Sequence, residues 1–281
     1  PFKFNTKNYL DHPPYLGDTR EKISHEKAGI IFKNSDVFTS NRNSTAINII
    51  EEKAKDTGAT FNNIHDLAST NLVKISPRGM VFNYFSEKVN LKKLYMPLTG
   101  IHQIENAKLA ITALLYNKTY SVEIKHIMDG LATVLWPGRL QLLHSKPSLL
   151  LDAGHNPDGF RNSLKTVKKV NKGRLLTVCG IVDDKNSKEI AELVEDFSDE
   201  IYLTNFESRR LLSPDKFVKF FSQPQNIKLF NRSCYSETEN LIKNINENDT
   251  ILIIGSHYLI GEFLHEWIKT KKGFAYYYQT P

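Results

Sequence analysis

After residue 147, short apolar runs alternate regularly with longer amphipathic stretches, and this pattern limits the chain to few folds. Strands are predicted at residues 148–151, 174–178, 201–204, 227–230 and 250–254. Helices are predicted between and after them, at residues 157–170, 187–197, 214–221 and 237–245, and from 257 to about 269. Strands that alternate with helices of this length form right-handed crossovers. Residues 137–281 are therefore predicted to form a doubly wound, mainly parallel, Rossmann-like α/β domain.

The first part of the chain has a less regular pattern. Helices are predicted at residues 18–29, 44–55, 100–116 and 122–135, strands at 35–40 and from 57 on, and short antiparallel runs between 70 and 99. Asp18 and Ser44 are the predicted N-caps of the first two helices. We place the domain boundary at the turn that begins with Pro137, which gives domains of residues 1–136 and 137–281.

Composition narrows the class of protein. The chain has 281 residues, 40% of them hydrophobic and 24% charged, which is typical of a soluble globular protein. Its two cysteines form no disulfide framework, no run of apolar residues is long enough to span a membrane, and the first residues do not resemble a signal peptide. We therefore expect a cytoplasmic protein with no membrane partner.

The net charge of +6 comes from lysines and arginines spread along the chain rather than gathered in blocks. No motif that combines basic and aromatic residues for nucleic-acid binding is present. Small anionic substrates explain the charge equally well, so no nucleic-acid partner is expected.

A polar cluster follows the predicted strand at residues 148–151. Asp152 and His155 come directly after it, Pro157 is placed to open a helix, and Arg139 lies upstream, after a predicted turn. Open α/β sheets bind ligands at the carboxyl ends of their strands. These side chains are therefore candidates for one site, although a turn, a helix cap and a surface histidine would produce the same short pattern.

Other polar residues lie near predicted helix ends. His12 lies in a loop before the first predicted helix, and Lys27 lies near the end of that helix. His102, Gln103 and Asn106 lie in the first turns of the helix after residue 100, where backbone donors and polar side chains can meet a ligand. Taken alone, His12 and Lys27 are more simply explained as a loop histidine and a solvated lysine than as ligands.

Several stretches, in their order along the chain, together resemble the folylpolyglutamate synthase/dihydrofolate synthase family of the Mur ligase superfamily. The resemblance covers almost the whole chain. It is carried by DHPPYLG and EKAGI within residues 11–30, GIHQIENA at 100–107, PGR at 137–139, DAGHNP at 152–157, GIVDDK at 180–185, the arginines at 209–210 and IIGSHYLIGE at 253–262.

The resemblance implies an ATP-dependent acid–amino-acid ligase that adds L-glutamate to a folate. Such an enzyme forms tetrahydrofolylpolyglutamate, and in bifunctional members it also makes dihydrofolate from dihydropteroate. ATP phosphorylates the carboxylate, and the amine of glutamate then attacks the acyl phosphate. The family implies Mg²⁺ with the ATP, small-molecule partners only, and a monomer.

The resemblance also implies roles for two groups of residues. His12 matches a magnesium ligand, and Lys27 matches a catalytic lysine whose carbamate supports the metal; carbamylation gives that side chain the oxygen donors that Mg²⁺ prefers.

The other group is expected to bind the nucleotide and the amino acid. Asn106, Arg139 and Asp152 match positions on the ATP side, at the adenine, the phosphates and the nucleotide respectively. His155 matches a catalytic position, and His155 and Ser256 match positions that organise the incoming glutamate or the phosphates.

One family motif is missing from the 281 residues. No G-x-x-x-x-G-K-[ST] loop, which cradles the ATP phosphates, occurs anywhere in the sequence. We therefore interpret residues 1–136 as the later part of a central ATP-binding domain, in an N-terminally truncated protein. We expect this polypeptide alone neither to bind ATP tightly nor to ligate.

Three other interpretations stay open at this stage. The chain is a Mur ligase acting on a UDP-muramyl peptide, or a non-catalytic remnant that serves as a binding module, or an α/β protein whose polar residues are only caps and surface charges. The missing phosphate loop favours the remnant, whereas EKAGI and GIHQIENA follow the folate branch.

Overall fold

The structure, a computed structural model, describes residues 2–5, 19–117, 121–183 and 186–270. The chain separates into two compact units. The N-terminal unit comprises Pro1–Lys74, Met80–Pro97 and Ile101–Val134, and the C-terminal unit comprises Ile75–Gly79, Leu98–Gly100 and Leu135–Pro281. The last change of unit, at Leu135, lies two residues before the boundary predicted at residue 137. Each unit is described by itself.

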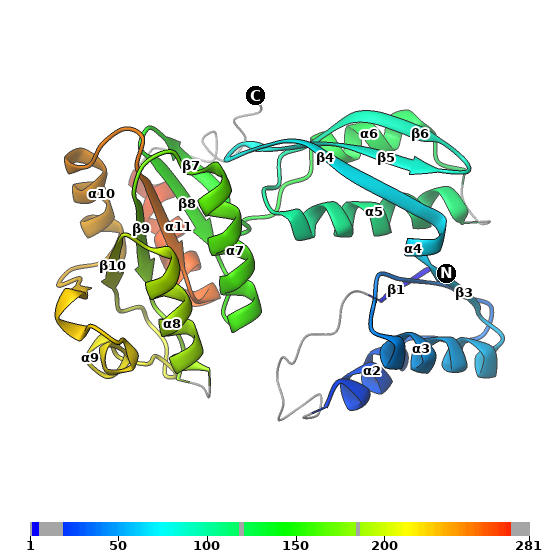
Figure 1. The fold of residues 1–281 in the computed structure, drawn as a ribbon, viewed down its shortest axis with the longest axis horizontal. Coiled ribbons are helices and arrows are strands. Elements are labelled where there is room, and N and C mark those ends of the chain that lie inside the picture. Colours follow the sequence, from blue (N-terminus) through cyan, green and yellow to red (C-terminus); the bar gives the residue numbers. More distant parts are fainter. Residues whose placement is uncertain (1, 6–18, 118–120, 184–185, 271–281) are drawn as a thin grey trace. The chain divides into compact units, whose positions relative to one another are not determined.

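The C-terminal unit is built on a six-stranded sheet with the strand order β11-β10-β9-β12-β8-β7 (Figure 1). Its strands are β7 (Gln141–Ser145), β8 (Ser148–Asp152), β9 (Leu175–Cys179), β10 (Glu200–Leu203), β11 (Lys228–Leu229) and β12 (Thr250–Ile254). The pairs among β8 to β12 are parallel, and only the edge strand β7 runs antiparallel to its neighbour β8. The prediction of a mainly parallel sheet is confirmed.

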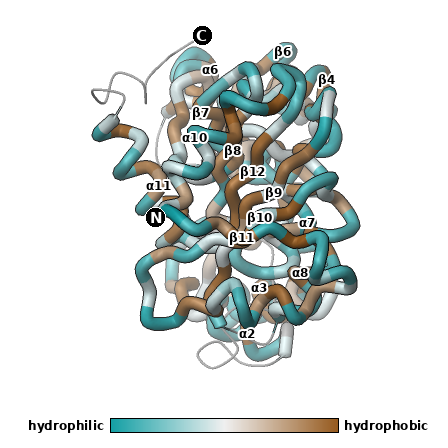
Figure 2. The backbone as a smooth tube through the Cα atoms, turned by 90° about the vertical axis from the view of Figure 1, so that its left-hand side faces the viewer, coloured by the Kyte–Doolittle hydropathy of each residue, from teal (hydrophilic) through white to brown (hydrophobic). Residues whose placement is uncertain are grey.

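Helices cover both faces of this sheet, as a doubly wound fold requires. Successive side chains of a strand point to opposite faces, and in β12 Leu252 and Ile254 join one core while Ile251 and Ile253 join the other. The first core is completed by α7 (Pro157–Val170), α8 (Ser187–Phe197) and α9 (Pro214–Phe217), and the second by α10 (Cys234–Asn244) and α11 (His257–Thr270). The central strands form the continuous hydrophobic band of Figure 2.

Local capping decides where the helices begin. Pro157 occupies the first position of α7, and the Asn156 side chain accepts a hydrogen bond from the Gly159 amide at 2.8 Å. The bounds of α7 and α8 are those predicted. In contrast, α10 begins three residues early because Ser233 caps it, and the helix predicted at 214–221 ends at Phe217 and continues as a short 3₁₀ turn, Val218–Phe220.

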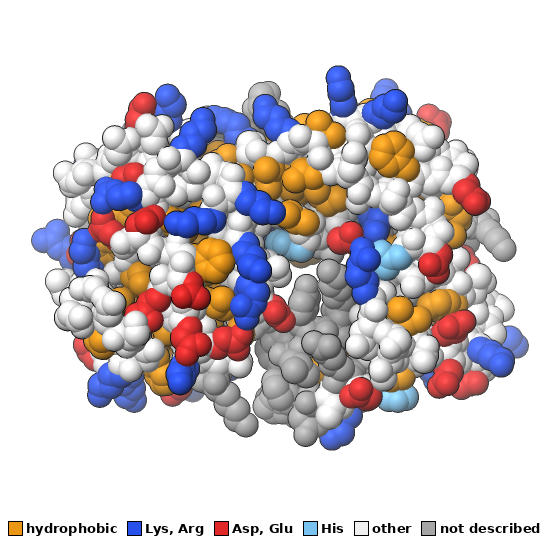
Figure 3. All heavy atoms as spheres, in the orientation of Figure 1, with side chains coloured by type: hydrophobic (Ala, Val, Ile, Leu, Met, Phe, Trp, Pro, Cys, Tyr) orange, Lys and Arg blue, Asp and Glu red, His pale blue; other side chains and the backbone are white. Residues whose placement is uncertain are grey.

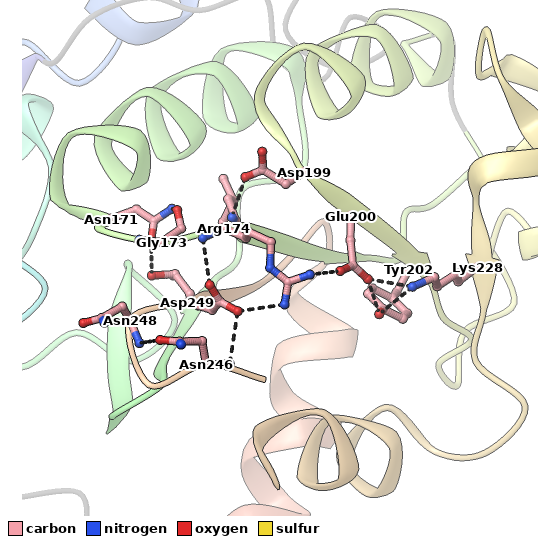
Figure 4. Close-up of polar contacts among 12 residues, drawn as sticks. Asn171, Gly173, Arg174, Asp199, Glu200, Tyr202, Lys228, Asn246, Asn248 and Asp249 are labelled. Atoms are coloured by element: carbon pink, nitrogen blue, oxygen red, sulfur yellow. Dashed lines mark hydrogen bonds and ion pairs between the residues drawn. The ribbon is translucent and has the colours of Figure 1, made fainter. Parts of the chain in front are cut away.

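A network of paired charges joins the amino ends of the strands in this sheet (Figure 4). The Arg174 guanidinium contacts Asp249 Oδ2 at 2.9 Å and Glu200 Oε1 at 2.5 Å, and Lys228 Nζ contacts Glu200 Oε2 at 2.6 Å. The Tyr202 hydroxyl donates to the same Glu200 oxygen. Burial alone would raise the pKa of Asp249, but hydrogen bonds from Arg174 hold that pKa below its ordinary value. We call these five residues the amino-edge network.

The N-terminal unit contains a small parallel sheet of order β1-β2-β3, formed by Phe2–Asn5, Asp36–Thr39 and Thr60–Asn63. The helices α2 (Arg20–Ala28), α3 (Ser44–Thr57) and α4 (Ile64–Leu67) accompany it. The N-cap of α3 is Asn43, not the predicted Ser44, because the Asn43 side chain accepts from the Ala46 amide at 3.0 Å. Similarly, Thr19 caps α2; Asp18, the predicted cap, lies outside the described residues.

The same unit contains most of the predicted antiparallel patch; only its segment Ile75–Gly79 belongs to the C-terminal unit. The strands of the patch are β4 (Ala68–Ser76), β5 (Gly79–Ser86) and β6 (Asn90–Met96), in that order, followed by α5 (Ile101–Tyr116) and α6 (Ile124–Ala132). The Tyr84 hydroxyl, from β5, is hydrogen-bonded to Thr112 on α5 at 3.1 Å, which ties that helix to the sheet. In the described part of the chain, no helix combines the length and the apolar character that a membrane crossing needs.

Candidate active site

The topology of the C-terminal sheet marks one position as a ligand site. The chain leaves β8 towards α7 on one face of the sheet, whereas it leaves the neighbouring strand β12 towards α11 on the other face. Doubly wound folds bind ligands where adjacent connections diverge in this way, outside the carboxyl ends of the strands. We call this region the carboxyl edge; it includes Arg139, Asp152, His155, Ser256 and His257.

Asp152 organises the carboxyl edge from inside the protein. It is 4% exposed, and its two carboxylate oxygens accept from the backbone amides of Gly154 at 2.8 Å and Leu140 at 2.9 Å. Burial raises the pKa of Asp152, although these hydrogen bonds, one from Ser163 and the charge of Arg139 oppose the rise. The carboxylate therefore joins the turn after β8 to the segment before β7.

Arg139 lies in that segment, which a second contact also fixes. The Ala153 amide donates to the Gly138 carbonyl at 2.8 Å, and Gly138 has a positive φ of 69° that favours glycine. The Arg139 side chain is half-buried, and its positive charge acts to lower the pKa of both Asp152 and His257. The segment that carries Arg139 is thus held against the turn that carries Asp152.

Two imidazoles meet at the carboxyl edge. The ring centroids of His155, in the turn after β8, and His257, the first residue of α11, are 5.3 Å apart with the rings tilted by 47°. The His155 Nδ1–H donates to the Ala153 carbonyl at 3.1 Å. Burial lowers the pKa of His257, and the positive charges of His155 and Arg139 lower it further.

Ser256 lies between the end of β12 and this histidine pair. It is 2% exposed, and its hydroxyl oxygen accepts from the Tyr258 amide at 3.1 Å. The preceding Gly255 has a φ of 130°, and a Cβ there would lie 2.3 Å from the Gly180 carbonyl oxygen. The end of β12 can therefore approach the end of β9 only because residue 255 is glycine.

Two exposed arginines follow β10 on the same edge of the sheet. Their loop is held by backbone hydrogen bonds, from the Asp183 amide to the Arg210 carbonyl at 2.7 Å and from the Leu212 amide to the Ile181 carbonyl at 3.0 Å. Within the described ranges, Arg209, Arg210 and Arg139 take part in no ion pair. Elsewhere, basic and acidic side chains are interspersed on the face shown in Figure 3.

Of the two candidate residues for the metal site in the N-terminal unit, the structure describes only one. Lys27 is half-buried in the last turn of α2, whereas His12 lies outside the described residues. Among the residues that the structure describes, no group of three or more His, Cys, Asp or Glu side chains is arranged to hold a metal ion.

A polar chain runs along the first turns of α5. The Asn106 amide donates to Gln103 Oε1 at 3.0 Å, and Gln103 Nε2 is 3.0 Å from His102 Nε2. Further along, Lys108 is only 3% exposed, and its ammonium lies 3.1 Å from His65 Nδ1 and 3.2 Å from Glu105. Asn106 itself is exposed, so its amide is open to a ligand from solvent.

Sequence reasoning missed His257. The residue adjoins Ser256 in the motif IIGSHYLIGE, but only the fold shows that it faces His155 across two neighbouring strands. The available signal was the recurrence of a histidine a few residues after each of two predicted strands, at His155 and at His257.

Comparisons with known proteins agree with this architecture. Residues 138–257 match the family described as Mur ligase, glutamate ligase domain. The chain is 30% identical over 264 residues to the dihydrofolate synthase/folylpolyglutamate synthase of Bacillus subtilis, an alignment covering 90% of this chain and 59% of that protein. The chain thus spans about three fifths of that relative's length.

At lower sequence identity, the chain is also similar to a ligase of the UDP-muramyl branch and to a solved structure. A UDP-N-acetylmuramoyl-L-alanyl-D-glutamate–2,6-diaminopimelate ligase of Prochlorococcus marinus is 27% identical over 276 residues, covering 90% of this chain and 50% of that protein. The structure of Mycobacterium tuberculosis folylpolyglutamate synthase complexed with ADP superposes with a TM-score of 0.84 at 22% identity. It covers 95% of this chain and 63% of that one, and it shows the shared fold.

Proposed function

Because this chain is homologous to the folylpolyglutamate and dihydrofolate synthases and carries a Mur ligase, glutamate ligase domain, we propose that it serves an ATP-dependent ligase that adds L-glutamate to a folate. The observation that carries the proposal is the 30% identity over 264 residues, which runs through both units. The substrates are then ATP, a folate or dihydropteroate, and L-glutamate.

The proposed reaction has two steps. A carboxylate oxygen of the folate attacks the γ-phosphorus of ATP, the bond to ADP breaks, and an acyl phosphate forms. The unprotonated amine nitrogen of glutamate then attacks the acyl carbon, the carbon–oxygen bond to phosphate breaks, and one proton passes from the nitrogen to the released phosphate or to solvent, so that the amide keeps one N–H. Both steps depend on positioning and on neutralising phosphate charge, since the protein contributes little covalent chemistry.

The carboxyl edge supplies groups suited to the second step. We assign Arg139 to the negative charge of the phosphates, and His155 and Ser256 to the incoming glutamate. In this assignment Asp152 acts mainly through the backbone that carries Arg139 and His155, because both of its oxygens already accept backbone hydrogen bonds. Asn106, exposed on α5, is assigned to the adenine.

Among the described residues no three His, Cys, Asp or Glu side chains are gathered to hold a metal ion, and His12 lies outside those residues. We therefore derive no step through the metal. Its assignment to His12 and to a carbamate on Lys27 remains a proposal that rests on the motifs around those residues.

A second candidate function has one specific observation in its favour, the 27% identity to a ligase of the UDP-muramyl branch. A hybrid protein distinguishes the two candidates. The whole 281-residue chain is joined to the part of the B. subtilis relative that it does not match, and phosphate release is measured with each substrate set. The folate proposal predicts release only when ATP, a folate and L-glutamate are all present.

The other outcomes of this assay are equally informative. Release with a UDP-muramyl peptide and not with a folate supports the second candidate. A hybrid that binds ATP but releases phosphate with neither substrate is a non-catalytic binding module. Turnover by the 281-residue chain alone would overturn the expectation that the missing phosphate loop makes it inactive.

A further inference from the structure

One cluster of charged side chains lies inside the N-terminal unit and has no part in the proposed reaction. Lys108, on α5, is 3% exposed, and its ammonium nitrogen lies 3.1 Å from His65 Nδ1 and 3.2 Å from Glu105 Oε2. Glu105 also lies 3.7 Å from the Arg42 guanidinium. An ammonium is costly to bury unless its partners replace the lost hydration, so the contacts of Lys108 are needed to keep it in place.

His65 joins that lysine to the end of a strand. It lies on the short helix α4, directly after β3, and its Nε2 is 3.1 Å from the carbonyl oxygen of Ser40, the residue after β2. Local hydrogen bonds order both segments, since the Asn63 side chain accepts from the His65 amide at 3.1 Å and the Thr39 hydroxyl accepts from the Asn41 amide at 3.2 Å. The ring thus connects α5 with the segments that follow two neighbouring parallel strands.

The two contacts of the ring fix where its hydrogen lies. An ammonium can only donate, so the Nδ1 that faces Lys108 is an unprotonated acceptor. A carbonyl oxygen can only accept, so the Nε2 that faces Ser40 carries the hydrogen. His65 is therefore the neutral Nε2–H tautomer, with both nitrogens in use. Burial lowers the pKa of His65; the bond to Ser40 and the charge of Glu105 oppose this, while Lys108 and Arg42 add to it.

A second proton on His65 is incompatible with this arrangement. Both ring nitrogens would then be donors, and a positive ring would face the ammonium of Lys108 at the present distance of 3.1 Å. Glu105 is the acidic group of the cluster, and Lys108 and Arg42 already contact it. The contact between His65 and Lys108 must therefore break when the ring is protonated.

We propose that His65 is a pH-sensitive connection within the N-terminal unit, which as a neutral imidazole joins Lys108 to the carbonyl of Ser40 and as an imidazolium releases Lys108. The segments that it holds follow the carboxyl ends of β2 and β3, the side on which open α/β sheets bind ligands. Acid therefore loosens the ligand side of this unit while β2 and β3 stay paired. The connection is independent of the folate reaction.

The direction of the pH effect follows from the lowered pKa of His65. The folded state binds this proton less readily than an open state, in which the pKa returns to about 6.5. The connection is complete above that ordinary value, and its contribution to stability is lost as the pH falls through the folded value. Backbone amides in the two segments should therefore lose protection from hydrogen exchange between pH 8 and pH 5.

The test uses the full 281-residue chain with ¹⁵N-labelled histidine rings and backbone. Long-range ring spectra at pH 8 should show that the Nε2 of His65 is protonated and the Nδ1 is not. Hydrogen exchange, corrected for its intrinsic pH dependence, is then followed at the amides of Asn41, His65 and Ala68, whose hydrogen bonds lie in the two segments. We expect protection to fall about tenfold from pH 8 to pH 5, as the loss of one hydrogen bond to a charged group implies.

Three variants separate the titration of the ring from its packing. His65→Gln keeps one donor and one acceptor but does not titrate, so protection should be retained at pH 8 and should not fall at pH 5. His126→Gln, at an exposed position of α6 in the same unit, is the matched control and should behave as the original chain. Lys108→Met removes a positive charge from the ring, so the pKa of His65 should rise towards its ordinary value.

The tautomer alone can overturn the proposal without any variant. An Nδ1–H ring, or an imidazolium at pH 8, would do so. An equal loss of protection in the original chain and in His65→Gln would also overturn it, as would a pKa of His65 that Lys108→Met leaves unchanged. Ligation by the hybrid protein, or its failure, has no bearing on these outcomes, so this proposal and the proposed function stand or fall separately.

Discussion

Charged side chains are paired with one another at one edge of the C-terminal sheet and, among the described residues, are not paired at the other. At the amino edge, Arg174 and Lys228 are each held against a carboxylate, and Glu200 is contacted by both. At the carboxyl edge, the buried carboxylate of Asp152 accepts from backbone amides, and Arg139 forms no ion pair with any described residue. One sheet therefore has an edge whose charges neutralise one another and an edge whose positive charge is available to a ligand.

The difference separates groups that stabilise the fold from groups that serve a site. A paired network satisfies its own donors and acceptors and leaves little for a ligand to gain. Basic groups without acidic partners contribute little to stability, but they offer an anion a prepared position. The following predictions test this division, beginning with the largest expected effect.

Replacing Asp152 by alanine should affect both stability and binding. The amides of Leu140 and Gly154 would lose their acceptor, and two buried donors without partners cost about 3 kcal/mol. Chemical denaturation of the variant measures the loss, and L-glutamate titration should show weakened binding because Arg139 and His155 are no longer fixed. A variant as stable as the original chain would show that Asp152 does not organise the carboxyl edge.

Replacing Asp249 by alanine should affect stability alone. The substitution removes a buried acceptor of both the Arg174 amide and its guanidinium, at a cost of about 2 kcal/mol. Denaturation of Asp249→Ala measures this loss, while its affinity for L-glutamate should equal that of the original chain. Reduced glutamate affinity would contradict the separation between the two edges.

The two carboxylates should also respond oppositely to acid. The pKa of Asp249 is lowered in the folded state, so its contribution to stability is present above the unfolded value and is lost as the pH falls through the folded one. The pKa of Asp152 is raised, so protonation of that group favours the folded state as the pH falls. Between pH 6 and pH 3, unfolding free energies should decline less steeply in Asp249→Ala than in the original chain. An unchanged slope would rule out the amino-edge network as a source of acid sensitivity.

Arg139→Gln should have the smallest effect on stability. The side chain is half-buried and forms no ion pair among the described residues, so we expect a change below about 0.5 kcal/mol. The pKa of His257 should nevertheless rise towards its ordinary value, because one of the charges that lower it is removed. Histidine ring NMR during a pH titration measures this shift, and a pKa that stays constant would mean that Arg139 does not act on the histidine pair.

Much of the C-terminal unit was predictable because its strands are buried on both faces. Such strands form short continuous apolar runs, and the strand at residues 250–254 has the predicted bounds. The helices at residues 157–170 and 187–197 also begin and end where they were predicted. Cap identity was harder to predict, since Asn43 and Ser44 are both good capping residues and only the backbone path decides between them. The helix at 214–221 was overestimated because its apolar pattern continues through a 3₁₀ turn.

The site was predictable in part. Arg139, Asp152 and His155 were candidates because they follow or flank a predicted strand, whereas Ser256 was a candidate through the family resemblance; the parallel topology places all four on one edge of the sheet. The role of Asp152 as an acceptor of backbone amides was not predictable, because it depends on the conformation of Leu140, whose φ is 44°. The contact between His155 and His257 depends on β8 and β12 being neighbours, an order that the sequence does not reveal.

Backbone amide NMR can map where L-glutamate binds on the 281-residue chain. We expect saturable shifts at the turn after β8, at the start of α11 and around Arg139, with no shifts in the amino-edge network. Shifts confined to the amino-edge network, or the absence of shifts at the carboxyl edge, would contradict this expectation.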